Sequence, residues 1–281
     1  MPAHVSPPMP LAPARSSPLH ALADYFYQIW RRRYFWWSLV KIELRTRYRG
    51  TYLGLGWSLL NPILMTIVMC LVFAKLFRQP LATYAPFVLS GLAFWNYLTG
   101  IVMDGCHSFR RGEAYIRQHP APLAIYPLKA SLVVGIHFVM ALLVLLGTVW
   151  VARGSVPWHA LWLLLPALGL FAVLGWTTAI VMGVVNVWFE DTAQLSQVVL
   201  RALFYATPVF YNGDMLRKHG LGWVVDWNPL AACLEVLRAP VLDGRPASLY
   251  TYGFLAAVAL GMTLLAGLIL WKVERKLIFH L

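Results

Sequence analysis

Three arginines at alternate positions, Arg45, Arg47 and Arg49, stand directly before a long apolar segment of the chain. The guanidinium group is a planar fork that holds a phosphate through two parallel hydrogen bonds, which a lysine ammonium does less well. Arginines at a membrane boundary also indicate which face of the membrane this part of the chain occupies. The cluster therefore predicts a contact with phospholipid headgroups or with a phosphate-bearing substrate.

The elements that position these arginines belong to a membrane protein. Hydrophobic residues make up 60% of the chain, charged residues only 12%, and the mean hydropathy is +0.65. A soluble domain with so few polar side chains could not cover its own surface. The formal charge of +12 could suggest nucleic acid, but the basic residues gather at the ends of apolar segments. We expect membrane lipids, and no nucleic acid, as partners.

Apolar segments of membrane-crossing length recur along the chain. An α-helix needs about 20 apolar residues to cross the hydrocarbon of a bilayer. Four such segments precede residue 190, a shorter one follows it, and a last one lies near the C-terminus. We therefore predict an all-α polytopic membrane protein with six transmembrane helices within residues 51–281. The expected spans are residues 52–77, 85–104, 130–151, 159–189, 195–211 and 249–271.

Two different segments precede the first span. Residues 1–20 hold six prolines and no apolar stretch of signal-peptide length, so we predict a disordered tail. In residues 21–50, Phe35, Leu39 and Ile42 recur at helical spacing, and basic residues follow one another on a second face. This pattern predicts an amphipathic helix that lies in the membrane interface. The alternative is a packed cytoplasmic helix with a solvated charged face.

The region between the fifth and sixth spans interrupts the pattern. Residues 212–243 begin with polar side chains, and their apolar part from Pro229 to Leu242 is too short to cross a bilayer. We predict a re-entrant or interfacial helical segment at the outer side. Glu235 and Arg238 lie three residues apart and could pair on one helix face.

Basic residues in the loops predict the orientation. With the N-terminus in the cytoplasm, fifteen basic residues fall on the inner side of the membrane and six on the outer side. Lysine and arginine are enriched in the cytoplasmic loops of membrane proteins. We therefore expect both termini to be cytoplasmic.

Several kinds of chemistry lack the residues they require. No glycine precedes a lysine, so the GxxxxGK[ST] loop is absent and the chain cannot bind ATP in that way. The three cysteines, Cys70, Cys106 and Cys233, and the histidines show no metal-ligand spacing, so we expect no metal. No carboxylate lies at the middle of a span, as proton-coupled carriers usually require, and His137 is expected to be a buried, hydrogen-bonded residue. A lipid-modifying membrane enzyme, which is the remaining class, would need a polar catalytic cluster that no span carries. The chain is thus expected to be no enzyme, and to move a substrate with energy from another chain.

Three stretches of the chain together resemble a known family. They are RTRYRGTYLGLGWSLLNPIL from Arg45, the pair Glu190-Asp191 followed by Gln194, and FYATPVFY with the later WNPLAACLEVLRAPVLDG. In this order and spacing they resemble ABC-2 type permeases that export polysaccharides and polyol phosphates. The resemblance covers nearly the whole chain after residue 24.

The resemblance implies an ABC-2 type permease fold in a bacterial inner membrane. It also implies a homodimer that works with two copies of a separate nucleotide-binding subunit, which would bind ATP and magnesium, so that this chain needs no cofactor of its own. The substrate would be a glycan on a polyprenyl pyrophosphate or another lipid. O-antigen is the first choice of polymer, and teichoic acid or capsular polysaccharide is the alternative.

Two groups of cytoplasmic residues gain roles from the resemblance. The gate residues that would meet a lipid pyrophosphate are Arg45, Arg47, Tyr48 and Arg49. Their alternative role is anchoring to anionic headgroups, worth about 1 kcal/mol per basic residue. The loop 106–128 is the expected docking site for the ATPase, through a short helix ended by prolines; otherwise it is an ordinary positively charged loop. Its candidate residues are Arg110, Arg111, Glu113, Tyr115 and Arg117.

Aromatic residues form the third group. Sugar rings stack on aromatic faces, so a polysaccharide path should carry such rings and few fixed charges. The resemblance implies that the first and fifth spans border this path. Aromatic residues at helical spacing are more often packing or interface residues, which is the alternative. The candidates are Trp57, Phe73, Phe204, Tyr205, Phe210 and Tyr211.

Overall fold

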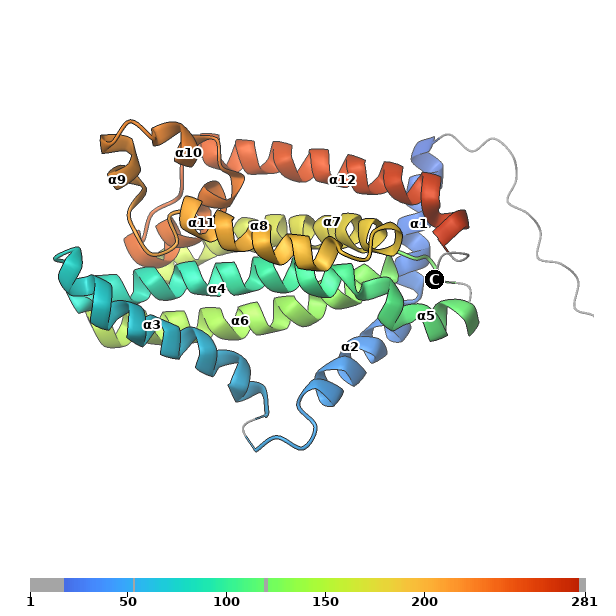
Figure 1. Ribbon diagram of the computed structural model, residues 1–281, viewed down its shortest axis with the longest axis horizontal. Coiled ribbons are helices and arrows are strands. Elements are labelled where there is room, and N and C mark those ends of the chain that lie inside the picture. Colours follow the sequence, from blue (N-terminus) through green and yellow to red (C-terminus); the bar gives the residue numbers. More distant parts are fainter. Residues whose placement is uncertain (1–17, 53, 119–120, 278–281) are drawn as a thin grey trace, which may run out of the picture.

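The computed structural model describes residues 18–52, 54–118 and 121–277 of the chain (Figure 1). Within these ranges the protein is all-helical, without strands. The α-helices are α1 (Pro18–Arg31), α2 (Arg33–Arg47), α3 (Trp57–Leu76), α4 (Leu81–Cys106), α5 (Ser108–Gln118), α6 (Ile125–Arg153), α7 (Leu164–Trp188), α8 (Thr192–Ala206), α9 (Gly213–Lys218), α10 (Gly222–Asp226), α11 (Pro229–Arg238) and α12 (Leu249–Leu277). Three shorter turns, η1 (Gly54–Gly56), η2 (Trp158–Leu163) and η3 (Ala239–Asp243), adjoin α3, α7 and α11.

Five helical segments of the described chain are long and apolar enough to cross a membrane. They agree with the first, second, third, fourth and sixth predicted spans. Their bounds are Leu59–Leu76, Leu81–Cys106, Ile125–Arg153, Trp158–Trp188 and Leu249–Glu274.

The predicted fifth span, residues 195–211, is helical only in part. α8 ends at Ala206 and has 15 residues, which is about 22 Å of helix against about 30 Å of hydrocarbon. The reason is Pro208, whose ring disfavours helical backbone at the preceding residue. Thr207 is accordingly extended, with φ −98° and ψ 139°. Helix length alone therefore gives five spans in the described chain, and not six.

α4 is the central helix of the bundle: α3, α6, α7 and α8 pack against it, while α12 packs on α7 (Figure 1). Of the residues in its apolar, membrane-crossing stretch, 67% are buried, against 22% in the corresponding stretches of α3 and α12. Tyr97 of α4 packs against Phe138 of α6 and Phe171 of α7, with ring centroids 4.8 and 6.3 Å apart. Its hydroxyl donates to the Phe171 carbonyl at 2.6 Å. α3 and α12 thus leave most of their side chains on the outside of the chain.

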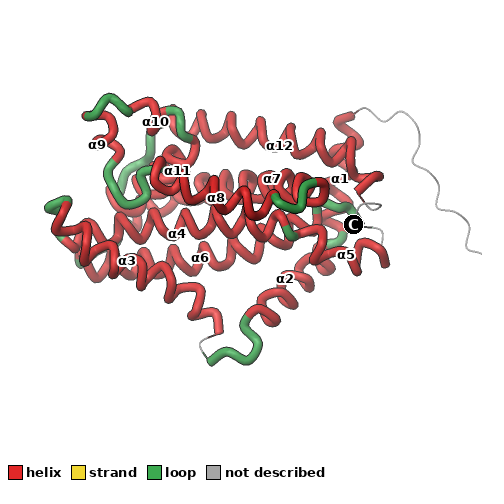
Figure 2. Tube along the Cα trace, viewed as in Figure 1, coloured by secondary structure: helices red, strands yellow, loops and turns green. Residues whose placement is uncertain are grey.

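The two ends of the bundle differ in structure. α1, α5 and the last turns of α12 lie at one end, and α9 and α10 lie at the opposite end (Figure 1). Figure 2 shows that the connection from α2 to α3 is a loop that lies away from the bundle. We refer to the end with α1 and α5 as the α5 end.

The predicted helix 21–50 is two helices that meet at Arg32. Arg32 leaves helical geometry, with φ −93° and ψ 22°, and the Trp36 indole bridges the break by donating to the Ile29 carbonyl at 3.2 Å. α1 packs through Ile29 onto the bundle, while Tyr27 and Trp30 are exposed. Of the predicted tail, residues 1–17 lie outside the described residues and the last three belong to α1.

The expected pair between Glu235 and Arg238 does not form. Glu235 accepts a hydrogen bond from the Thr251 hydroxyl at 3.2 Å. Arg238 donates instead to the Ser90 hydroxyl of α4 and to the carbonyls of Pro208 and Val209, which follow α8. The physical reason is that the backbone after α8 is not helical, so its carbonyls need donors from elsewhere.

Candidate functional site

The predicted gate arginines occupy different surroundings. Arg47, at the end of α2, donates to Asp104 at 2.8 Å and lies 3.8 Å from Glu43. All three arginines are exposed, Arg47 with 34% of its side chain accessible. They differ in that carboxylates hold Arg47, which leaves the outer two as the better candidates for binding a ligand.

Asp104 and Glu43 are the acidic centres of a charged network of five residues. The two oxygens of Asp104 accept from Arg47 at 2.8 Å and from Arg111 at 2.9 Å. Glu43 accepts from Lys129 at 3.1 Å and lies 3.6 Å from Arg111. The side chains of Asp104 and Lys129 are only 14% and 10% exposed, so water screens the network less than it screens a surface pair. We call these residues, Glu43, Arg47, Asp104, Arg111 and Lys129, the charged network.

The charged network joins four helices at the α5 end. Glu43 and Arg47 belong to α2, Asp104 to α4, Arg111 to α5 and Lys129 to α6. Burial alone would lower the pKa of the Arg47 guanidinium, but the hydrogen bond and charge of Asp104 raise it above its ordinary value. Arg47 is thus a fixed cation, and an incoming phosphate must compete with a carboxylate for it.

Tyr48 makes a separate polar contact with the membrane segment. Its hydroxyl lies 2.6 Å from Nε2 of His137, which is on α6. His137 is thus hydrogen-bonded, as expected, although it is half-buried and not buried. Elsewhere in the described residues, no group of three or more histidine, cysteine or carboxylate side chains is arranged to hold a metal ion.

The tyrosine of α1 ties that helix to the same end of the bundle. Tyr25 donates to the carboxylate of Glu274 at 3.1 Å, and the backbone N–H of Leu123 donates to the same oxygen at 3.2 Å. Burial and the charge of Glu274 raise the pKa of Tyr25, so its hydroxyl remains a donor at physiological pH. α1 is therefore bonded to the last turns of α12 and to the segment before α6.

α5 is a short amphipathic helix inside the predicted docking loop. Its buried face, Ser108, Phe109, Gly112 and Ile116, packs against the bundle. A Cβ atom on Gly112 would lie 2.4 Å from the ring of Tyr126, so only glycine allows this close approach. The candidate residues Arg110, Arg111, Tyr115 and Arg117 are exposed and Glu113 is half-buried.

Several of these exposed groups are already paired within the chain. Glu113 accepts from Arg117, one turn later, at 3.0 Å. Arg110 forms an ion pair with Glu190, which precedes α8. Tyr115 packs edge-on against Phe35 of α2, with ring centroids 6.3 Å apart. α5 consequently contacts both the N-terminal helices and the start of α8.

Five of the six candidate path residues form one aromatic cluster. Phe210 lies at its centre, with its ring centroid 5.5 Å from Phe73, 5.7 Å from Phe204 and 5.2 Å from Tyr211. Tyr205 packs on Phe204 at 5.4 Å and is 68% exposed, so part of the cluster is open. We call Phe73, Phe204, Tyr205, Phe210 and Tyr211 the aromatic cluster.

Trp57 is separated from this cluster. It is the first residue of α3, whereas Phe73 lies near the end of that helix. Sixteen residues of helix correspond to about 24 Å. The structure therefore leaves Trp57 out of the aromatic cluster.

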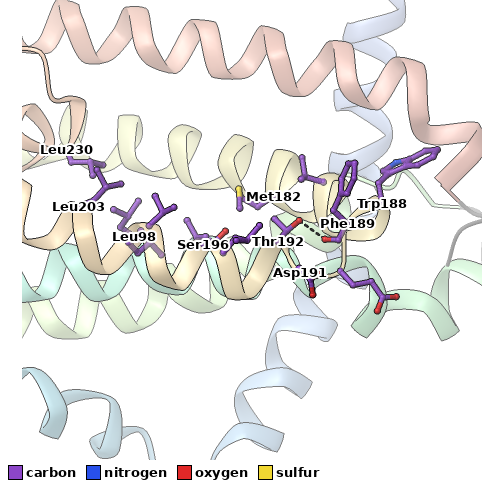
Figure 3. Close-up of a pocket in the computed structure, with 15 residues that line it drawn as sticks. Leu98, Met182, Trp188, Phe189, Asp191, Thr192, Ser196, Leu203 and Leu230 are labelled. Atoms are coloured by element: carbon purple, nitrogen blue, oxygen red, sulfur yellow. Dashed lines mark hydrogen bonds between the residues drawn. The ribbon is translucent and has the colours of Figure 1, made fainter.

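A cavity of about 810 Å³ runs along α8, between this helix and α4 and α7. Figure 3 shows Asp191 at one of its ends and Leu203 with Leu230 at the other. The lining between them is largely apolar, with Thr192 and Ser196 as polar exceptions. Its volume is within the range of ligand sites, about 300–1,000 Å³. The sequence alone does not predict this cavity, because its walls come from several helices, of which α4 is far from α7 and α8 in the chain.

The sequence alone does not predict the charged network either. Its signals are the spacing of Glu43 and Arg47, four residues apart, and the position of Asp104 at the end of an apolar segment. A carboxylate at such a position needs a cationic partner. The sequence alone does not say which arginine supplies it.

Comparisons with known proteins agree with this architecture. The family model for ABC-2 type transporters matches residues 34–242. The O-antigen export system permease protein RfbA of Klebsiella pneumoniae is 26% identical over 205 residues, which cover 72% of this chain and 78% of that protein. RfbA of Myxococcus xanthus is 28% identical over 212 residues, or 74% and 80% of the two chains. The polysialic acid transport protein KpsM of Escherichia coli is 20% identical over 236 residues, or 83% and 91%.

The matched region contains the candidate site. It begins in α2, includes the charged network, α5, the cavity and the aromatic cluster, and ends in η3. It covers more than half of the chain, and the described helices include five of membrane-crossing length. The chain therefore belongs to the ABC-2 type transporter family of membrane proteins.

Proposed function

We propose that the chain is the membrane subunit of an ATP-driven exporter for a lipid-linked polysaccharide. The cargo would move from the cytoplasmic side to the outer side of the bacterial inner membrane. O-antigen is the first choice, because three of the relatives are O-antigen export permeases. The similarity to KpsM supports capsular polysaccharide as the alternative, and teichoic acid is a further one.

One observation carries the mechanical part of the proposal. The charged network connects α2, which leads into the first span, with α5, which presents an exposed basic face. In the proposed exporter two ATPase subunits, loaded with ATP and magnesium, press on α5 of a permease homodimer. The network then carries that displacement to α2 and to the arginines at its end.

The proposed topology has six membrane segments and two cytoplasmic termini. α8 with the following residues 207–211 would be the fifth segment, completed by non-helical backbone. The position of α1 beside the end of α12 supports a common side for the two termini (Figure 1). The exposed rings of Tyr27, Trp30 and Tyr34 support an interfacial position for the N-terminal helices.

The proposed gate binds a polyprenyl pyrophosphate first through Arg45 and Arg49. Their exposure supports this order, because Arg47 is held by Asp104. The aromatic cluster would then receive sugar rings near the other end of α8. Its exposed ring, Tyr205, supports contact with sugar rings.

Deletion of the gene in its source organism tests the proposed function. We expect the long-chain glycan to disappear from the cell surface and a lipid-linked glycan to accumulate at the inner face of the membrane. Expression of the parent chain should restore export, and affinity purification should recover an ABC nucleotide-binding subunit. Unchanged surface glycan in the deletion strain would contradict the proposal. Analysis of the accumulated polymer distinguishes O-antigen from capsule and teichoic acid.

A further inference from the structure

Arg238 is a partly buried cation whose acceptors are neutral oxygens. Nε donates to the Ser90 hydroxyl at 3.1 Å, Nη1 to the Pro208 carbonyl at 2.7 Å, and Nη2 to the Val209 carbonyl at 2.6 Å. Nη2 also lies 3.3 Å from the Phe87 carbonyl, and Cζ lies 3.8 Å from the centre of the Phe87 ring. All three nitrogens of the guanidinium therefore donate hydrogen bonds to two parts of the chain, α4 and the segment that follows α8.

One of those parts is the non-helical segment that follows α8. Three successive carbonyls of this segment accept from side chains: those of Pro208 and Val209 from Arg238, and that of Phe210 from the Tyr84 hydroxyl at 2.9 Å. In addition, the side-chain amide of Asn228 donates to the Thr207 hydroxyl at 3.0 Å. Irregular backbone at membrane depth is tolerated only where protein groups satisfy its polar atoms. These bonds consequently hold the segment in one place.

α4 approaches the same segment closely. A Cβ atom on Gly91 would lie 2.3 Å from the Val209 oxygen and 2.7 Å from Nη2 of Arg238. Any larger residue at this position would displace the carbonyl or the guanidinium. The contact between α4 and the Val209 carbonyl therefore requires both a glycine at position 91 and the guanidinium of Arg238.

A planar fork is required at this position. The acceptor oxygens lie on α4 and on the segment after α8, and the three guanidinium nitrogens reach them simultaneously. A lysine has a single nitrogen at the end of its side chain and cannot replace three separated donors. Lysine would preserve the charge and lose most of the hydrogen bonds.

We propose that Arg238 is a positioning residue for the aromatic cluster. It sets the path of residues 207–211, and with it the placement of Phe210 and Tyr211 against Phe204 on α8. The placement itself does not depend on the nature of the cargo. Its consequence for export rests on the proposed function, in which these rings contact the glycan.

Cysteine labelling tests the placement. Val209 is 0% exposed and the native cysteines are buried, so Val209→Cys should react slowly with a maleimide in otherwise unchanged protein. With Arg238→Met or Arg238→Lys added, we expect labelling to accelerate about tenfold, since a charged hydrogen bond no longer opposes local opening. Leu145→Cys, on α6 and also 0% exposed, is the matched control and should label at its original rate. Unchanged labelling at Val209→Cys, or an equal rise at Leu145→Cys, would overturn the proposal.

Export by Arg238→Lys and by a second variant, Gly91→Ala, tests the consequence. Both are expected to lower surface glycan several-fold, while an ATPase subunit co-purifies with them as with the parent. Faster labelling of Val209→Cys in the Arg238→Lys background, together with normal export by Arg238→Lys and by Gly91→Ala, would overturn the link to the path. The labelling experiment requires no substrate, so failure of the proposed function would be recognised separately, by a parent chain that restores no export.

Discussion

At the residue scale, the three gate arginines differ in the contacts that a substitution would remove. All three are exposed at the end of α2, but only Arg47 donates a hydrogen bond to a carboxylate that is mostly buried, that of Asp104. Stability should therefore depend on Arg47, and ligand binding on its neighbours. Three arginines that look equivalent in the sequence separate into one that is bonded to Asp104 and two that the proposed function assigns to ligand binding.

Replacement of Asp104 by asparagine should destabilise the permease. Arg47 and Arg111 would both lose their charged acceptor, at a cost of about 1.5–3 kcal/mol for each bond to a charged group. We expect a clear fall in the temperature of thermal aggregation in detergent. Glu113→Gln is the matched control, because its exposed pair with Arg117 contributes only about 0.3–0.5 kcal/mol. Equal melting of the two variants would show that the charged network adds no more than a surface pair.

The double variant Arg45→Lys/Arg49→Lys should retain parent stability and lose export. Lysine keeps the charges that anchor α2 to anionic lipid, but it cannot hold a pyrophosphate through a bidentate fork. We expect surface glycan to fall several-fold at an unchanged level of protein in the membrane. Arg31→Lys, also exposed and distant from α3, is the control. Normal export by the double variant would leave headgroup anchoring as the role of these residues.

At the element scale, α5 combines a close-packed face with an exposed one. Gly112 lets the helix lie directly on Tyr126, and the exposed face carries Tyr115 and Arg117. A helix held this closely moves as a rigid body with the start of α6. Binding of a partner and transmission of its motion can therefore be separated by mutation of the two faces.

Tyr115→Ala with Arg117→Ala should weaken co-purification of an ATPase subunit without changing membrane insertion. The two side chains are exposed, and their loss leaves the buried face of α5 intact. Quantitative pull-down against the parent chain provides the measurement. Retention of the ATPase at parent level would assign docking to another surface.

Gly112→Ala should leave docking intact and reduce export. The added methyl group would meet the Tyr126 ring at 2.4 Å and push α5 away from α6. The control is Gly135→Ala on α6, whose Cβ atom would meet no atom within 4 Å. We expect low export with normal pull-down for Gly112→Ala, and parent behaviour for Gly135→Ala. Equal export by both would show that the close contact is not needed for coupling.

At the scale of the whole molecule, the distribution of burial separates a fixed centre from outer helices. α4 is mostly buried, whereas α3 and α12 each have 22% of their membrane-length window buried. Outer helices with so much uncovered apolar surface contact lipid or a second subunit. In the proposed homodimer, these are the surfaces available for the partner.

Topology reporters test the proposed orientation of the molecule. A fluorescent protein fused to the C-terminus should be bright, because it folds in the cytoplasm. Alkaline phosphatase inserted between α9 and α10 should be active, because that end of the bundle would face outward. Activity of the phosphatase at the C-terminus, with none at α9, would reverse the proposed orientation.

The long spans could be predicted from the sequence because apolar length is a local property. α4, α6 and α12 extend the predicted spans by only a few residues, and η2 with α7 covers the fourth. The end of α8 is also determined by a local feature, Pro208. The apolar residues continue beyond this proline, and apolar length alone therefore predicts a span that is too long. Five of the six candidate path residues lie together, because they come from residues 204–211 and one facing helix, while Trp57 lies apart. Their contact with a glycan stays a prediction.

The polar contacts could not be predicted in the same way. Arg238 has a carboxylate three residues away in the sequence, yet it bonds to carbonyls on two other segments. Asp104 takes partners from α2 and α5, which are separated from each other by more than 60 residues. Such pairs depend on where whole helices pack, and no local pattern contains that information.

The break at Arg32 and the charged network together leave α2 attached at both of its ends. On one side it is joined to α1, which Tyr25 bonds to the bundle; on the other, Arg47 is bonded to Asp104. Between these two points Glu43 accepts from Lys129 of α6, and Leu39 and Val40 are buried, so the helix is held along one side as well. A rod held in this way can neither slide along its axis nor turn freely about it. A push on α5 would therefore displace α2 as one body, and Arg45 and Arg49 at its end would share that displacement, so that loading of the cargo would follow the position of the whole helix.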